Sequence, residues 1–229
     1  MKINNLRTLF IVSAAAAVLS SCKIEHPTYY NAYMTALNNG GESSSFCTLI
    51  TDDSITVYPL NQYTFFSQLK TNDRVYATFT IPSGEITDPM EVEFNSVTML
   101  TPLDIVATSS SDTLNADDPA NPETIWQSGG IKGVSRFLNI VYTVNVSQYS
   151  PFHGIYLVDD LNQESNPDPS GYYHLRFMHN ANNDPGTLRS TSVATFPLTE
   201  KYTAPGIKGI KVRFSPIDLG VDSTLTLTF

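Results

Sequence analysis

Residues 73–81 read Asp-Arg-Val-Tyr-Ala-Thr-Phe-Thr-Ile, and apolar and polar side chains alternate along them. An extended strand places these residues in two sets on opposite faces, Val75, Ala77, Phe79 and Ile81 against Arg74, Tyr76, Thr78 and Thr80. The same period of two recurs in residues 136–146 and 221–229, and no amphipathic stretch of helical length occurs. Such alternation is typical of antiparallel sheets with one wet face, so the sequence predicts an all-β protein.

The period of two changes phase once, within residues 90–100. Met90, Val92 and Phe94 keep one phase, whereas Val97 and Met99 take the other. A β-bulge near Asn95-Ser96 would reconcile the two halves. Bulges bend strands, and small closed barrels need strongly bent strands at their corners.

Turn-forming residues separate the predicted strands, and the longest such stretch is 107–123. We interpret this stretch as an interdomain connection, with a boundary near residue 108. The predicted units are a domain at 28–108 and a domain at 109–229, of which 109–123 form the connection.

The first 21 residues have the layout of a bacterial secretory signal. Lys2 and Arg7 precede an apolar run from Leu9 to Leu19, which is too short to span a membrane. The run ends in Leu19-Ser20-Ser21-Cys22, which resembles a lipobox, so we expect lipidation at Cys22 and a tether at 22–27. The residue after Cys22 is Lys23 and not Asp, which favours sorting of the protein to the outer membrane. Which face of that membrane carries the protein is left open. Acyl chains at Cys22 would anchor the protein stably, because two already suffice.

Composition narrows the range of partners. Without residues 1–21 the chain has 11 basic and 22 acidic residues, a formal charge of −11. Residues 28–103 hold only two cations, Lys70 and Arg74, so a nucleic-acid groove is not expected there. Cys47 is the only thiol left besides Cys22, and its apolar surroundings predict a buried, inert side chain.

Several segments resemble the NigD-like lipoproteins of Gram-negative bacteria. They are residues 30–37, 46–60 with the turn Thr51-Asp52-Asp53-Ser54, 73–76, 92–103, 125–130, 137–140, 153–158 and 175–184. The resemblance implies an N-terminal OB-like barrel followed by a C-terminal antiparallel β-sandwich. The family takes its name from a bacteriocin locus, and the resemblance implies no catalytic activity. Ser54 departs from the glycine usual at its turn.

The sequence predicts no reaction centre and no cofactor. Common hydrolase and nucleotide-binding motifs do not occur, so we expect a protein that is not an enzyme. His174 and His179 are five apart on one predicted strand and so project to opposite faces; for His179 we expect a structural role at the turn that follows. Asn166-x-Asp168-x-Ser170-Gly171 resembles half of a calcium loop, but position twelve is Phe177, so a solvated acidic loop is the better interpretation.

Aromatic side chains could bind a glycan by stacking, and the available rings are Trp126, Tyr149, Phe152, Tyr172 and Tyr173. Tyr172, His174 and Arg176 share one predicted strand face, opposite Tyr173, Leu175 and Phe177. That polar face, with Trp126, is the candidate ligand or interface site, and an ordinary wet sheet face is the alternative.

Three classes of function therefore remain open. The first is a non-catalytic envelope lipoprotein that binds a protein or glycan partner. The second is a bacteriocin immunity or self-protection protein, suggested by the family name alone. The third is an enzyme with a site built from loops.

Overall fold

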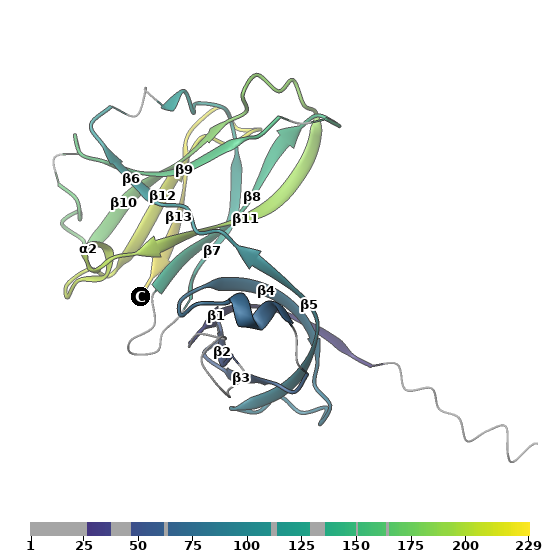
Figure 1. Ribbon diagram of the computed structural model, residues 1–229. Coiled ribbons are helices and arrows are strands. Elements are labelled where there is room, and N and C mark those ends of the chain that lie inside the picture. Colours follow the sequence, from purple (N-terminus) through teal and green to yellow (C-terminus); the bar gives the residue numbers. More distant parts are fainter. Residues whose placement is uncertain are drawn as a thin grey trace, which may run out of the picture.

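The computed structural model describes residues 27–37, 47–61, 64–110, 114–128, 136–149, 151–163 and 165–229. A closed β-barrel forms one unit, and a second unit of two sheets lies next to it (Figure 1). The all-β prediction is confirmed. The predicted signal peptide and Cys22 fall outside the described residues.

Five strands form the barrel: β1 (Tyr29–Ala36), β2 (Leu49–Thr51), β3 (Thr56–Pro59), β4 (Arg74–Thr80) and β5 (Met90–Leu100). They close in the order β1-β2-β3-β5-β4, and β4 pairs back onto β1. A short 3-10 helix, η1 (Thr64–Gln68), lies between β3 and β4 in the chain. This arrangement confirms the OB-like barrel.

The barrel core follows the alternation in the sequence. Val75 and Ala77 of β4 are fully buried, and Phe79 is 3% exposed. The predicted bulge in β5 is also present, because Thr78 pairs with Ser96 and Phe79 with Phe94, which leaves Asn95 as the extra residue. Val97 packs on the core as expected. Met99 was expected beside it but is 42% exposed, at the end of β5 that β3 does not reach.

The second unit is a sandwich of eight strands and one helical turn. Its elements are β6 (Ile105–Thr108), β7 (Asn121–Ser128), β8 (Arg136–Val146), β9 (Gly154–Asp160), β10 (Tyr172–Asn180), β11 (Leu188–Leu198), α2 (Glu200–Thr203), β12 (Gly209–Phe214) and β13 (Ser223–Thr228). One sheet has the order β13-β12-β10-β9-β6 and the other β11-β8-β7. Inward side chains such as Leu138, Leu175 and Ile210 fill the core between them.

Two features of the sandwich differ from the prediction. The pairs β10–β12 and β6–β9 are parallel, so the five-stranded sheet is mixed and not purely antiparallel. β6 pairs with β9, so the sandwich already begins at Ile105, ahead of the boundary near residue 108. The polar stretch after β6 connects β6 to β7, and both strands belong to the sandwich. It is therefore a loop inside the second domain and not the connection between the two domains.

The two units meet at a group of buried and partly buried polar side chains, which we call the junction cluster: Asp52, Arg74, Trp126 and Asn139. Arg74 was expected on the wet face of its strand, but its side chain is fully buried. Its guanidinium donates to both carboxylate oxygens of Asp52, at 2.5 and 2.9 Å, and to Oδ1 of Asn139 on β8, at 3.0 Å. The face of β4 that was expected to be solvent-exposed is therefore buried at Arg74, because the sandwich covers it.

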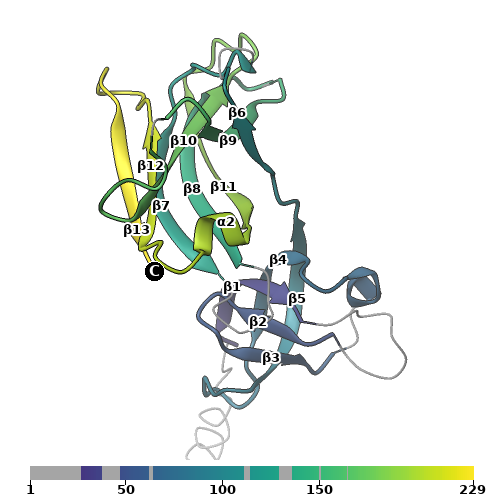
Figure 2. The ribbon, with the colours of Figure 1, turned by 90° about the vertical axis from the view of Figure 1, so that its left-hand side faces the viewer.

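Figure 2 shows the barrel at one end of the sandwich, with the opposite end remote from it. Within the described ranges, no helix has the length and apolar character that crossing a membrane requires.

Candidate functional site

The candidate face lies on the five-stranded sheet, on the side away from the sandwich core. Tyr173, Leu175 and Phe177 of β10 point into the core and are at most 3% exposed. Tyr172, His174 and Arg176 alternate with them and are half-buried on the outer side. The period of two in β10 therefore places these three side chains as the sequence predicts, and a ligand there stays a prediction.

The neighbouring strand adds two cations that sequence reasoning missed. β12 runs parallel to β10, with Lys211 opposite His174 and Arg213 opposite Arg176. The alternation in residues 209–214 could have placed Lys211 and Arg213 on one face. Pairing of two strands about 35 residues apart could not be deduced from local periodicity.

Asp168 binds both members of the first cross-strand pair, His174 and Lys211. Its carboxylate accepts hydrogen bonds from Ser170 Oγ at 2.6 Å, His174 Nε2 at 2.8 Å and Lys211 Nζ at 2.9 Å. These donors, led by Ser170, hold the pKa of Asp168 far below its usual value, so it is ionised at neutral pH. In the loop that resembles half of a calcium site, the Asp168 carboxylate is therefore occupied by hydrogen bonds to side chains of the same chain.

Arg176 and Arg213 have weaker partners. Arg176 lies 3.6 Å from Asp117 and Arg213 lies 3.4 Å from Asp222, and both aspartates are well exposed. Exposed pairs at such distances contribute about 0–1 kcal/mol, and like charges opposite each other repel. The two guanidiniums therefore keep most of their capacity to bind an anion from outside.

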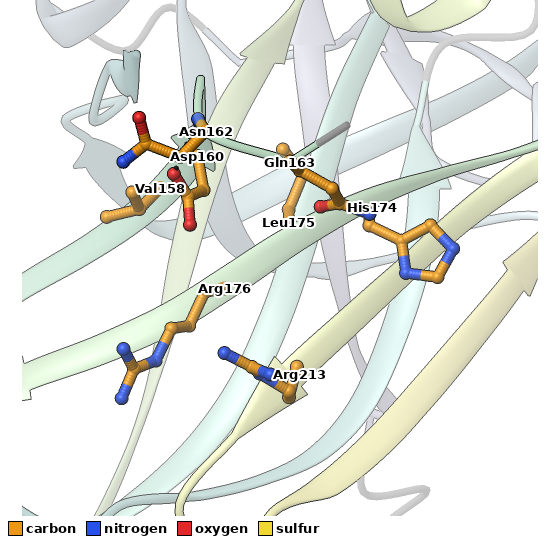
Figure 3. Close-up of a pocket in the computed structure, with 8 residues that line it drawn as sticks. All are labelled: Val158, Asp160, Asn162, Gln163, His174, Leu175, Arg176 and Arg213. Carbon is orange, nitrogen blue, oxygen red and sulfur yellow. Dashed lines mark hydrogen bonds between the residues drawn. The ribbon is translucent and has the colours of Figure 1, made fainter. Parts of the chain in front are cut away.

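A cleft of about 260 Å³ runs beside these arginines (Figure 3). Its lining, which we call the basic cleft, consists of Val158, Asp160, Asn162, Gln163, His174, Leu175, Arg176 and Arg213. Guanidinium groups bind carboxylates and phosphates through two parallel hydrogen bonds, and the amides add donors and acceptors. Such a lining can bind and orient an acidic ligand.

Trp126, the fourth predicted site residue, lies elsewhere. Its indole Nε1 donates to Asp52 at 2.7 Å, and its ring packs against Tyr33 at a centroid distance of 5.4 Å. It therefore belongs to the junction cluster. The structure brings together Tyr172, His174 and Arg176 but not Trp126.

His179 has a structural environment at the end of β10. It is 2% exposed, its Nδ1 donates to the carbonyl of Pro119 at 3.0 Å, and its Nε2 faces His153 Nδ1 at 2.8 Å. His153 Nε2 in turn lies 3.0 Å from Asp184 Oδ2. Burial lowers the pKa of His179, which keeps it neutral. Across the described ranges, no group of three or more metal-ligating side chains is assembled for a metal ion.

These observations define a class: a two-domain all-β protein, with an OB-like barrel packed on a β-sandwich that carries a basic cleft. The family model for the NigD-like C-terminal beta sandwich domain matches residues 104–227. That range is more than half of the chain, so the protein belongs to the NigD-like family. The family is not one of known enzymes.

Solved structures share the whole two-domain arrangement. A protein of unknown function from Bacteroides vulgatus is 18% identical, with a TM-score of 0.69 over 88% of this chain and 91% of that one. A NigD-like immunity protein from Bacteroides caccae is 19% identical, with a TM-score of 0.60 over 89% and 98%. A protein named as a lipoprotein from Bacteroides fragilis is 10% identical, with a TM-score of 0.64 over 88% and 98%. These likenesses show the fold, and no curated protein matches the sequence.

Proposed function

We propose that this protein is a non-catalytic outer-membrane lipoprotein that is anchored at Cys22 and binds an acidic glycan of the cell envelope in the basic cleft. The anchor is supported by the lipobox resemblance at residues 19–22 and by the fold shared with a protein named as a lipoprotein.

The observation that carries the binding proposal is the adjacent pair Arg176 and Arg213. The chain has a formal charge of −9, yet two guanidiniums lie opposite each other on one sheet face, with weakly held partners. Repulsion between them costs stability, so an incoming carboxylate, sulfate or phosphate would relieve it. The cleft is slightly smaller than the usual pocket for a drug-sized ligand, a size that suits one acidic sugar unit of a longer glycan.

Affinity electrophoresis in gels that contain polygalacturonate, with neutral dextran as the control polymer, tests this proposal. We expect polygalacturonate to retard the mature chain with Cys22→Ala, which does not require detergent. The pair of substitutions Arg176→Gln and Arg213→Gln should weaken binding by about tenfold or more, because each hydrogen bond to a charged group contributes about 1.5–3 kcal/mol.

Arg189→Gln is the matched control, since Arg189 is half-exposed on another sheet and pairs with Asp218 at 2.8 Å. Equal retardation of the double variant and the Arg189→Gln control would contradict the site. Membrane fractionation tests the anchor separately: Cys22→Ala should move the protein into the fraction not bound to membranes, and continued tight membrane association would contradict lipidation.

Immunity to a bacteriocin is the second candidate function, because the similar protein from Bacteroides caccae is named a NigD-like immunity protein. Deletion of the gene should then make the cells sensitive to a bacteriocin of a neighbouring strain, and the wild-type gene should restore resistance. Unchanged sensitivity to every bacteriocin tested would leave the glycan proposal as the only one supported.

A further inference from the structure

The turn that follows β10 surrounds a polar pocket of about 380 Å³, separate from the basic cleft. Four asparagines and two aspartates line it, together with Ala181. They come from residues 180–184 and from the stretch before β7, at Asn115 and Asp118. A pocket this rich in side-chain amides matches ligands that both donate and accept hydrogen bonds.

The backbone of this turn is fixed in an uncommon conformation. Asn182 and Asn183 both have positive φ, 50° and 61°. Asparagine tolerates the left-handed region better than most residues, but two in succession must be held by their surroundings. Asp118 accepts a hydrogen bond from the amide of Ala181 at 2.7 Å, and the amide of Asn182 donates to Asn180 Oδ1 at 2.7 Å.

Two histidines, of which His179 is buried, anchor the same turn. The chain of hydrogen bonds from Pro119 through His179 and His153 ends at Asp184 Oδ2, which also accepts from the amide of Ser147 at 2.9 Å. The pocket is therefore held in shape before a ligand arrives, which lowers the entropic cost of binding.

The engaged carboxylates favour an uncharged ligand over a cation. Asp118 and Asp184 already accept hydrogen bonds from backbone and imidazole N–H groups. The side chains of Asn115 and Asn183 are exposed at the pocket. Amide groups there complement vicinal hydroxyls, each of which is both a donor and an acceptor.

An exposed aromatic residue is linked to the pocket through its backbone. Phe152 is 85% exposed, and its backbone carbonyl accepts a hydrogen bond from the side-chain amide of Asn182, a pocket residue. The apolar face of a pyranose ring can stack on such a side chain while its hydroxyls reach the amides.

We infer that this pocket binds a neutral hexopyranose unit, with Asn115 and Asn183 contacting its hydroxyls and Phe152 its apolar face. The site goes beyond the proposed function, because it uses neither Arg176 nor Arg213. The strand β10 connects the two sites, since its residues 174–176 line the basic cleft and its end leads into the pocket.

Saturation-transfer NMR with methyl glycosides of glucose, galactose and mannose tests this inference on the mature chain with Cys22→Ala. We expect at least one glycoside to receive saturation. Phe152→Ala and Asn183→Gly should each reduce the signal at least threefold. Glycine suits the positive φ of Asn183, so Asn183→Gly deletes the amide while the turn keeps its conformation.

Matched controls separate recognition from folding. Asn72→Gly changes an asparagine of φ 75° in the barrel, and Leu219→Ala removes another exposed apolar side chain, so both should leave the signal unchanged. Arg176→Gln should also leave it unchanged, which separates this site from the basic cleft. The inference is overturned if no glycoside receives saturation, if Phe152→Ala and Asn183→Gly bind as the controls do, or if EDTA abolishes the signal.

Discussion

Replacing Arg74 by alanine should destabilise the protein strongly, because it leaves a carboxylate at the junction between barrel and sandwich without its cation. The guanidinium makes two hydrogen bonds to Asp52, one to Thr35 and one to Asn139. The Asp52 side chain is 11% exposed, and after the change it keeps the indole N–H of Trp126 as a donor.

The magnitude follows from burial. Removal of one partner from a buried ion pair costs about 3–5 kcal/mol, and the slight exposure of Asp52 favours the lower end, about 3 kcal/mol. For a chain of this size each kcal/mol lowers Tm by about 2–4 °C, so the expected decrease is about 6–12 °C. Arg189→Ala, in an exposed pair with Asp218, should cost less than about 1 kcal/mol.

Urea unfolding, followed by circular dichroism and by fluorescence, measures both losses. Trp126 is the only tryptophan of the chain and touches Asp52, so its emission reports directly on the junction. The double change Arg74→Met with Asp52→Leu should recover at least half of the loss, because no charge then remains buried. A cost for Arg74→Ala as small as that for Arg189→Ala would refute the reasoning.

Three further predictions concern single residues. Cys47 is 1% exposed, and burial, with a smaller contribution from Asp73, raises the pKa of its thiol to about 11. In the Cys22→Ala protein at pH 8, a thiol reagent should therefore label Cys47 only after denaturation. Rapid labelling of the native protein would contradict the burial of Cys47. Because the pKa of His179 is lowered in the folded protein, the unfolded chain binds a proton at this imidazole more readily. The free energy of unfolding should therefore fall as pH drops below about 6.5. In urea titrations at pH 7.5 and 5.5, the loss of stability between the two pH values should be smaller for His179→Gln than for the wild-type protein. Ser54 has a φ of 69° at the β2–β3 turn, so Ser54→Gly should raise the free energy of unfolding by about 0.5–1 kcal/mol, and a loss of stability would contradict backbone strain at this turn.

Much of the fold could be predicted because it rests on local periodicity. Alternation fixes which face of β4 and β10 is buried, and the change of phase in β5 located the bulge within one residue of Asn95. The order and class of the two units came from the resemblance to the NigD-like family. The candidate face on β10 was likewise found from the alternation of Tyr172, His174 and Arg176.

Contacts between distant segments were not predictable in the same way. Arg74 looked like a solvent-facing residue until Asn139, 65 positions later, was seen to cover it. Arg213 lies beside Arg176 only because β10 and β12 pair in parallel, and Trp126, predicted as a ligand-binding residue, lies in the junction cluster.

The sequence by itself determined the β-strands, their inward faces and the lipobox resemblance at its start, because each depends on neighbouring residues of one segment. The tertiary structure alone decided which polar side chains are buried, which cations share a cleft and which asparagines share a pocket. The physical reason is that strand pairing and domain packing bring together residues far apart in the chain, and a period of two contains no information about its partner strand.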